Sequence, residues 1–139
     1  MNKTKLIILF LISMICNNSY SSYLNTPKKI TIKVTNFQSL SEKSISCNEF
    51  SDAFIGDIKT VEVNNNKIIN QVMFLIGESV GCLQDSFSLD TRAKIYIYYK
   101  NHIDTLCIGK FLFFSSNGKF KKIKNDDLIN FLDSIYWHR

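Results

Sequence analysis

The sequence has few of the residues that usually mark turns and breaks, with one proline and five glycines in 139 residues. It is rich in isoleucine, asparagine and lysine instead, and we attribute this bias to the base composition of the gene and not to function. It contains no internal repeat and no low-complexity linker. Together with the length, this indicates one domain, with no room for a second full core.

The sequence also lacks the clusters that most enzymes and metal proteins need. Its cysteines include no Cys-x-x-Cys pair, and both histidines, His102 and His138, are isolated from the cysteines along the chain. Zinc sites usually combine such residues at short spacings. We therefore predict no metal, no cofactor and no catalytic residue, so the sequence favours a protein that is not an enzyme.

The first residues have the order of a secretory signal peptide. Lys3 and Lys5 lead into an apolar run over 6–15, and a short polar stretch follows. The run is about ten residues long, against about 20 for a helix that spans a bilayer. We therefore predict no permanent membrane span.

Small residues place the cleavage site. Ser19 and Ser21 fit positions −3 and −1 of a cut before Ser22. We therefore expect a signal peptide over 1–21 and a single exported α+β domain over 22–139, in the periplasm or secreted.

A lipid anchor is the alternative to a freely exported domain. Cleavage before Cys16 would allow lipidation of its thiol, and the polar residues that follow would suit a tether. Ile15 would then stand at position −1, where bacterial lipoproteins normally carry a small residue.

The charge of the mature chain is mild. Without Lys3 and Lys5, 15 of the 17 basic residues remain against 12 acidic ones, a net charge near +3. This excludes a nucleic-acid partner, which needs a concentrated basic face. One short stretch is enriched in lysine, and it predicts either a strand edge guarded by lysine or a docking patch for an acidic partner. Its members are Lys119, Lys121, Lys122 and Lys124.

Three cysteines follow the cleavage site, which allows one disulfide and one remaining thiol. Cys107 lies inside an apolar strand pattern, so we expect it to be buried and unpaired. Cys47 and Cys82 lie at the edges of elements, where a bridge forms more easily. We therefore predict a Cys47–Cys82 disulfide.

The first half of the domain alternates strands and helices. Alternation of β-branched and polar residues predicts strands over 30–35 and 58–63. A weak 3–4 spacing from Cys47 to Phe54 indicates a short helix. The run Asn64–Asn66 can cap a longer helix with a broad apolar face, whose end is bracketed by glycines. That face comprises Ile68, Ile69, Val72, Met73, Leu75 and Ile76, and the glycines are Gly77 and Gly81.

The second half predicts a three-stranded antiparallel meander from Lys94 to Lys124. Asn117-Gly118 is a strong hairpin signal because a type I′ turn needs two residues with positive φ. Gly109 indicates a bulge or bend within a long central strand. The predicted strands are 93–99, 103–114 and 120–123.

The chain ends in an amphipathic helix. Asn125 can cap it, and Asp126 and Asp127 lie at its positive end. The predicted fold class is therefore α+β, a small antiparallel sheet with a C-terminal three-stranded meander, packed by one central and one C-terminal helix. The helix face that packs on the meander comprises Leu128, Phe131, Leu132, Ile135 and Tyr136.

Two motifs match catalytic sites in their sequence of residues but not in their predicted structural context. Gly77–Gly81 matches G-x-S-x-G, but that elbow needs a strand before the serine, and a helix is predicted before Ser79. His102 lies in a predicted turn beside Asp104, where it is typical of an exposed histidine.

The strongest strand predicts a two-sided pattern. Residues at i and i+2 share a face, so Ile95 and Ile97 should face the C-terminal helix. Tyr96 and Tyr98 should then lie on the opposite face, which is either an open binding surface or covered by a second helix. The predicted binding residues are Tyr96, Tyr98, Lys94 and Lys100.

One part of the sequence resembles small exported bacterial proteins that carry no assigned activity. The residues involved are hairpin and core positions over about the last third of the chain. The resemblance therefore carries over no catalytic residue. Its segments are Arg92–Tyr99, Asp104–Cys107, Asn117-Gly118-Lys119 and the closing Leu128…Phe131 helix.

These features favour a non-enzymatic envelope or secreted protein that docks another protein, as an inhibitor or immunity-type factor does. Two other classes stay open: a small secreted hydrolase with a site built from loops, and an accessory subunit of an envelope complex. A deep pocket with converging polar side chains would favour the hydrolase. A flat face of tyrosine, phenylalanine and lysine would favour binding.

Overall fold

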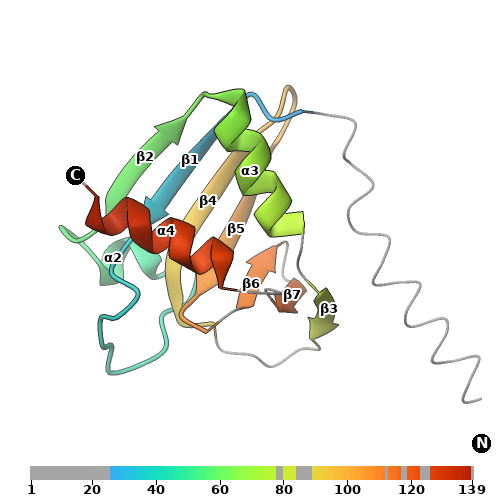
Figure 1. Cartoon of the computed structure of the whole chain (residues 1–139). Coiled ribbons are helices and arrows are strands. Elements are labelled where there is room, and N and C mark those ends of the chain that lie inside the picture. Colours follow the sequence, from blue (N-terminus) through green and yellow to red (C-terminus); the bar gives the residue numbers. More distant parts are fainter. Residues whose placement is uncertain are drawn as a thin grey trace, which may run out of the picture.

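Seven strands form one antiparallel sheet, with order β2-β1-β4-β5-β6-β7-β3 (Figure 1). The computed structural model describes residues 26–77, 80–83, 89–111, 113–116, 119–122 and 126–138. The strands are β1 Lys29–Val34, β2 Lys59–Val63, β3 Val80–Leu83, β4 Thr91–Tyr98, β5 Ile103–Gly109, β6 Phe113–Ser116 and β7 Lys119–Lys122. The helices are α2 Phe50–Ala53, α3 Asn66–Gly77 and α4 Asp127–Trp137. The predicted α+β class, with one central and one C-terminal helix, is confirmed.

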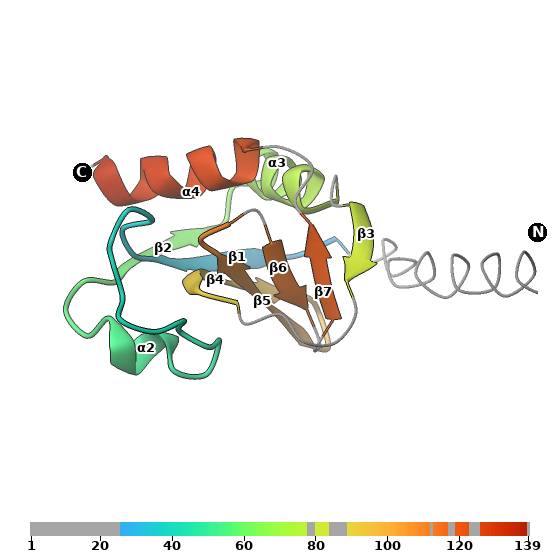
Figure 2. The same cartoon turned by 90° about the horizontal axis from the view of Figure 1, so that it is seen from below.

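The two longer helices lie together on one face of the sheet, as Figure 2 shows. Alternate residues of the central strands point into the layer between sheet and helices, and the apolar stripes of α3 and α4 fill it from above. The main hydrophobic cluster therefore lies on this side of the sheet, and Phe50 of α2, on the other side, is also fully buried. The most deeply buried members of the cluster include Ile30, Ile32, Val34, Ile69, Val72, Ile76, Ile95, Leu106, Ile108, Leu128 and Leu132.

The asparagine run begins α3 as predicted. The Asn65 side-chain oxygen accepts hydrogen bonds from the backbone amides of Lys67 and Ile68, at 2.9 and 3.3 Å. Two amides of the first turn, which have no partner within the helix, are satisfied in this way. Gly77 is the last residue of α3, whereas Gly81 lies in β3 and does not end the helix.

The predicted central strand over 103–114 is wrong, because the chain reverses after Gly109. β5 and β6 pair with each other, with Leu106 opposite Ser116. The meander therefore has four strands, β4 to β7. Side chains alternate with a period of two residues both before and after a tight reversal of the chain. The alternation in the sequence therefore did not distinguish one long strand from two short ones.

The predicted hairpin at Asn117-Gly118 is confirmed by register. Ser116 lies opposite Lys119 across β6 and β7, which leaves a two-residue connection. Those two residues lie outside the described part of the chain. β7, which holds the described lysines of the lysine-rich stretch, is flanked on its other side by β3. The prediction that this stretch forms an edge strand is therefore wrong.

A long connection crosses the sheet face opposite α3 and α4. It runs from the end of β1 to the start of β2 and contains α2, which Figure 2 shows on that side. It covers Arg92 of β4, whose side chain is fully buried. The guanidinium donates to the hydroxyls of Ser39 and Ser41 at 2.8 and 2.9 Å. Its carbon also lies 5.0 Å from the centre of the Phe54 ring.

Asp90 neutralises this arginine. Its Oδ2 accepts from Arg92 at 2.7 Å, and its Oδ1 accepts from the backbone amide of Ile45 at 3.1 Å. The carboxylate side chain is 14% exposed, so the ion pair is shielded from water. A buried charge needs this pairing and hydrogen bonding. The pair therefore holds the connection against β4.

We predict that Arg92→Met lowers the free energy of unfolding by about 3–5 kcal/mol, because it leaves the Asp90 carboxylate shielded and without its counter-charge. Urea denaturation measures this loss. Lys43→Met is the matched control, since Lys43 and Glu49 form an exposed pair with side chains 73% and 50% exposed. Such pairs contribute about 0–1 kcal/mol, and equal losses in the two variants would contradict the assigned role of Arg92.

Candidate functional site

The sheet face opposite α3 and α4 carries three of the four predicted binding residues, Lys94, Tyr96 and Tyr98. In the register of β1 and β4, Thr31 lies opposite Tyr96 and Lys29 opposite Tyr98. Ile95 and Ile97 point the other way and are buried in the core beside α4. The predicted assignment of the two faces is therefore confirmed. Tyr96 and Tyr98 are half-buried, not fully exposed.

Lysines of β1 lie against both tyrosine rings. The Lys29 ammonium is 4.9 Å from the centre of the Tyr98 ring, and Lys33 is 5.8 Å from that of Tyr96. A cation over an aromatic face is attracted by the ring quadrupole. Lys29 also pairs with Glu62 of β2 at 3.0 Å. These contacts hold the lysine side chains along the face.

An exposed apolar side chain adjoins Tyr98. Ile103 of β5 lies directly opposite Tyr98, and it is 56% exposed. Tyrosine is enriched at protein interfaces. We name the set Lys29, Lys33, Lys94, Tyr96, Tyr98 and Ile103 the tyrosine face.

Lys100 does not belong to this face by strand position. It lies in the turn between β4 and β5, beyond the last residue of β4, and is exposed. The turn is closed by the Tyr99 amide, which donates to the His102 carbonyl at 3.0 Å, and the two rings stack at 4.4 Å. Strand alternation therefore does not apply to Lys100.

The predicted Cys47–Cys82 disulfide is wrong, since Cys47 is bonded to Cys107. Their Cα atoms are 5.7 Å apart, within the range for a disulfide. Cys107 is buried as predicted but is not unpaired. Cys107 lies on the same sheet face as its register partner Lys94. The connection that carries Cys47 passes over this face.

Sheet order explains why Cys82 is not the partner. Its strand, β3, is separated from β5 by β6 and β7. Three strand spacings amount to about 14 Å, beyond the roughly 7 Å limit between bonded cysteines. The side chain of Cys82 lies outside the described part of the chain.

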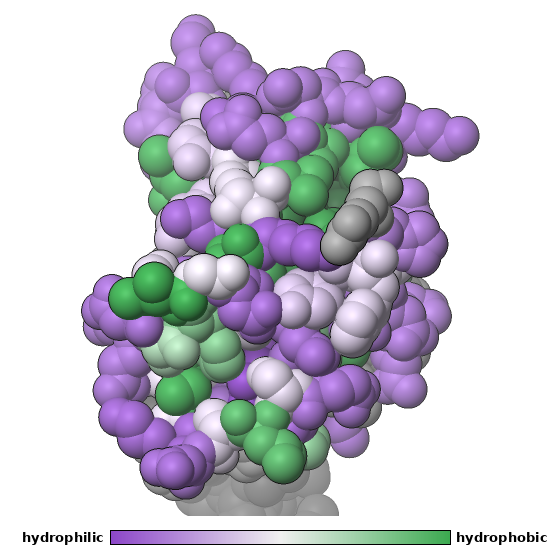
Figure 3. All heavy atoms as spheres, turned by 90° about the vertical axis from the view of Figure 1, so that its left-hand side faces the viewer, coloured by the Kyte–Doolittle hydropathy of each residue, from purple (hydrophilic) through white to green (hydrophobic). Residues whose placement is uncertain are grey.

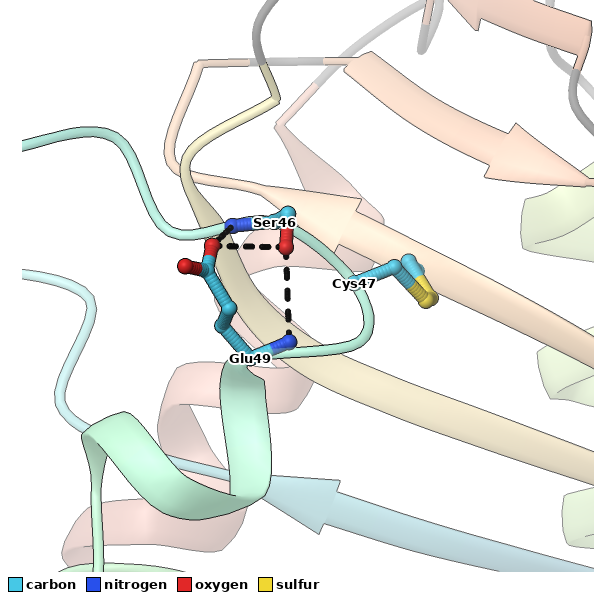
Figure 4. The surroundings of a disulfide bond; sticks show 4 residues. Ser46, Cys47 and Glu49 are labelled. Atoms are coloured by element: carbon cyan, nitrogen blue, oxygen red, sulfur yellow. Dashed lines mark hydrogen bonds between the residues drawn. A yellow bond between two sulfur atoms is a disulfide. The ribbon is translucent and has the colours of Figure 1, made fainter.

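A capping box holds the segment that carries Cys47 (Figure 4). The Ser46 hydroxyl accepts from the Glu49 amide at 3.3 Å, and the Glu49 carboxylate accepts from the Ser46 amide at 3.2 Å and from its hydroxyl at 2.7 Å. These bonds from Ser46, with the nearby Lys43, lower the pKa of Glu49 to about 2. The Ser-x-x-Glu spacing was a sequence signal for this turn, which directly precedes α2, whose N-cap residue is Glu49.

Asp57 joins the connection to the C-terminal helix. It accepts hydrogen bonds from the hydroxyls of Thr35 and Tyr136, both at 2.5 Å. The bond from Thr35, and then that from Tyr136, lower the pKa of Asp57, and the same contact raises the pKa of Tyr136. Because the folded pKa is depressed, this stabilisation is present above the unfolded pKa and is lost as pH falls through the folded value. The Lys59 ammonium donates to the Tyr136 carbonyl beside it.

The geometry does not support a catalytic role for the Gly77–Gly81 motif or for the His102–Asp104 pair. Ser79 lies outside the described residues, but helix α3 precedes it and strand β3 follows it, the reverse of a nucleophile elbow. The His102 and Asp104 side chains approach to 3.9 Å and are 45% and 33% exposed. The distance is long for an ion pair, and both side chains are open to solvent at one end of the sheet.

Two further searches cover only the described part of the chain. There, no three His, Cys, Asp or Glu residues gather closely enough to hold a metal ion. No helix within the same residues is long and apolar enough to cross a membrane. The predicted signal peptide and the alternative lipid site at Cys16 fall in 1–25, outside that part.

The surface on the β2 side mixes apolar and polar groups. Figure 3 shows hydrophobic residues there as small groups separated by hydrophilic ones. Large exposed apolar side chains come from different elements around the molecule. They are Leu40, Ile55, Phe74, Ile103, Phe111 and Trp137, each more than half exposed. Ile103 is the one that adjoins the tyrosines.

Comparisons of the chain with protein-family models, with curated proteins and with solved structures found no match. Function must therefore be argued from the residues of the tyrosine face and their surroundings.

We predict that peptide mapping without reductant recovers Cys47 linked to Cys107. Closing a loop over a sequence separation of 60 stabilises the fold by about 4 kcal/mol in the chain-entropy account. Cys47→Ser should lower the free energy of unfolding by roughly that amount in urea, and reductant should remove the difference from the unsubstituted protein. A Cys47–Cys82 peptide, or unchanged stability, would show that this pairing is wrong.

We also predict that the two sides of β4 respond differently to truncation. Ile97→Ala opens a cavity in the core and should cost about 2–5 kcal/mol. Tyr98→Ala removes a half-buried ring and its contact with Lys29, and should cost much less. Thermal and urea unfolding compare the two variants. Equal destabilisation would mean that the tyrosine side is core as well.

Proposed function

We propose that this is an exported, non-enzymatic binding protein that docks another protein through the tyrosine face. The observation that carries the proposal is the pairing of half-buried Tyr98 with exposed Ile103, on the sheet side opposite α3 and α4. Tyrosine contributes a large contact area at a low entropy cost, and it is enriched among residues that dominate binding energy. A role as an inhibitor or immunity-type factor fits such a surface.

The rest of the domain supports a rigid platform. The core, the Arg92–Asp90 pair and the Cys47–Cys107 bond fix the strands that carry the face. Rigid strands position side chains before binding and reduce the entropy lost on association. A disulfide is also in keeping with an oxidising compartment outside the cytoplasm, which supports the proposed export.

The small-hydrolase alternative has less support. Such a site needs a nucleophile or water, a base and an orienting group within hydrogen-bond reach. Two shielded or hydrogen-bonded carboxylates are already engaged, Asp90 by Arg92, and Asp57 by Thr35 and Tyr136. The accessory-subunit alternative would use the same tyrosine face and differs only in the lifetime of the complex.

A photo-crosslinking amino acid tests this proposal in cells. Benzoylphenylalanine at position 98 should give a covalent adduct with a second protein. The same residue at position 74, on α3, is the matched control because Phe74 is an aromatic residue 65% exposed on the helical side. For the captured partner, Tyr98→Ala should weaken binding by about 2 kcal/mol, close to 30-fold, while Phe74→Ala leaves it unchanged. Equal adducts at both positions would refute the assignment of the face.

Secretion is tested separately. Intact mass of the protein from the envelope or medium should correspond to a chain that begins at Ser22. An acylated N-terminal Cys16 would instead place the protein on a membrane surface, with the same tyrosine face available to a partner.

A further inference from the structure

Two lysines of the tyrosine face lie directly opposite each other. Lys33 of β1 is the register partner of Lys94 of β4, and both side chains are half-buried. Like charges at directly opposite positions of neighbouring strands destabilise a sheet. Among the described residues, neither lysine has a carboxylate within ion-pair distance, whereas Lys29 nearby is paired with Glu62. The fold therefore carries an uncompensated pair of positive charges at its centre.

A buried hydroxyl lies beside this pair. Thr31 is two residues before Lys33, on the same face of β1, and is 6% exposed. Its Oγ1 has no hydrogen-bond partner among the described residues. A buried polar atom without a partner is costly and uncommon in folded proteins. It is one of four such atoms among the described residues, the others being Thr91 Oγ1, Arg92 Nε and Asp133 Oδ1, and it adds a polar atom to the face that carries the lysine pair.

The four side chains form a compact square. Thr31 and Lys33 lie on β1, with Tyr96 and Lys94 as their register partners on β4. We name this square the anion subsite. The Lys33 ammonium lies 5.8 Å from the centre of the Tyr96 ring. The two ammonium groups and the Tyr96 phenol can all donate hydrogen bonds to an acidic oxygen.

We propose that the anion subsite receives a carboxylate side chain, aspartate or glutamate, of the protein that docks on the tyrosine face. The inference rests on the proposed function and names the chemistry of the partner. In the complex, the carboxylate would neutralise Lys33 and Lys94. An apolar residue next to that carboxylate would pack on Tyr98 and Ile103.

The surroundings favour an acidic protein segment over a phosphate or nucleic acid. A nucleic-acid surface needs a track of basic groups along the backbone, whereas these two lysines are adjacent and Lys29 is already paired with Glu62. The exposed Ile103 and the Tyr98 ring next to the subsite suit a peptide side chain. Charge complementarity and apolar contact therefore point to the same partner class.

The test uses the full chain labelled with nitrogen-15 and three probes: an eight-residue oligoglutamate, inorganic phosphate and an eight-nucleotide thymidine strand. Oligoglutamate should shift the backbone amide signals of Thr31, Lys33, Lys94 and Tyr96. Lys33→Gln with Lys94→Gln should weaken its binding at least tenfold. Lys67→Gln removes one positive charge at an exposed position on α3, so it is the control for each single substitution and should change affinity less than twofold.

Charge reversal gives a second readout that a purely structural lysine would not show. Lys94→Glu places opposite charges across β1 and β4, so the midpoint of thermal unfolding should rise while oligoglutamate binding is lost. A fall in the midpoint together with retained binding would overturn the proposal. If Lys94→Glu fails to fold, Lys94→Gln supplies the same comparison with the charge only removed.

The outcomes separate this inference from the proposed function. Thymidine or phosphate binding at the subsite as tightly as oligoglutamate, or an equal loss with Lys67→Gln, would refute an acidic protein partner. If oligoglutamate does not shift these amides while position 98 still crosslinks a partner, the subsite is wrong and the proposed function stands. If it shifts them and position 98 captures nothing, the subsite stands and the docking proposal is wrong.

Discussion

A buried arginine constrains how this sheet is covered. Arg92 lies on the sheet side away from α3 and α4, yet its side chain is fully buried. A guanidinium can be removed from water only if other groups replace the lost hydrogen bonds. Ser39, Ser41 and Asp90 do so for the two terminal nitrogens, while Nε has no partner among the described residues, and the two serines belong to the connection before α2. The connection is therefore held over one end of the sheet, which brings Cys47 to Cys107.

Partial coverage of this side explains where the candidate site lies. The connection and α2 contact β4 near its beginning, around Arg92, whereas Tyr96 and Tyr98 lie towards its end. The same strand thus has a buried polar network at one end and half-buried aromatic residues at the other. The disulfide joins the connection to β5 and fixes the boundary between these regions.

The sequence predicted most of the elements that make up the core and the assignment of faces on β4. Alternation over 93–99, the Asn65 cap and the stripe on α4 are local signals, and each agrees with the packing. The reversal after Gly109, the edge strand β3 and the partner of Cys47 depend on which strands become neighbours. That choice is set by long-range packing, so one period-two pattern suited both a long strand and a hairpin. Within the site, the residues on β4 were predicted from the sequence. Their neighbours Lys33 and Ile103 were not, because they are identified only once the register between strands is known.

The two sides of the sheet differ in how well neighbouring side chains match one another in charge, hydrogen bonding and hydrophobicity. On the side of the helices, the registers of β1, β4 and β5 pair apolar residues with apolar residues, apart from Ile97 opposite Asp104. On the other side, Lys33 faces Lys94, the Thr31 hydroxyl is unsatisfied, and Ile103 is exposed. Real proteins tend to depart from local rules at functional sites. Departures in charge, hydrogen bonding and apolar exposure have independent physical causes, so their occurrence on one small area supports the proposal that a partner completes it.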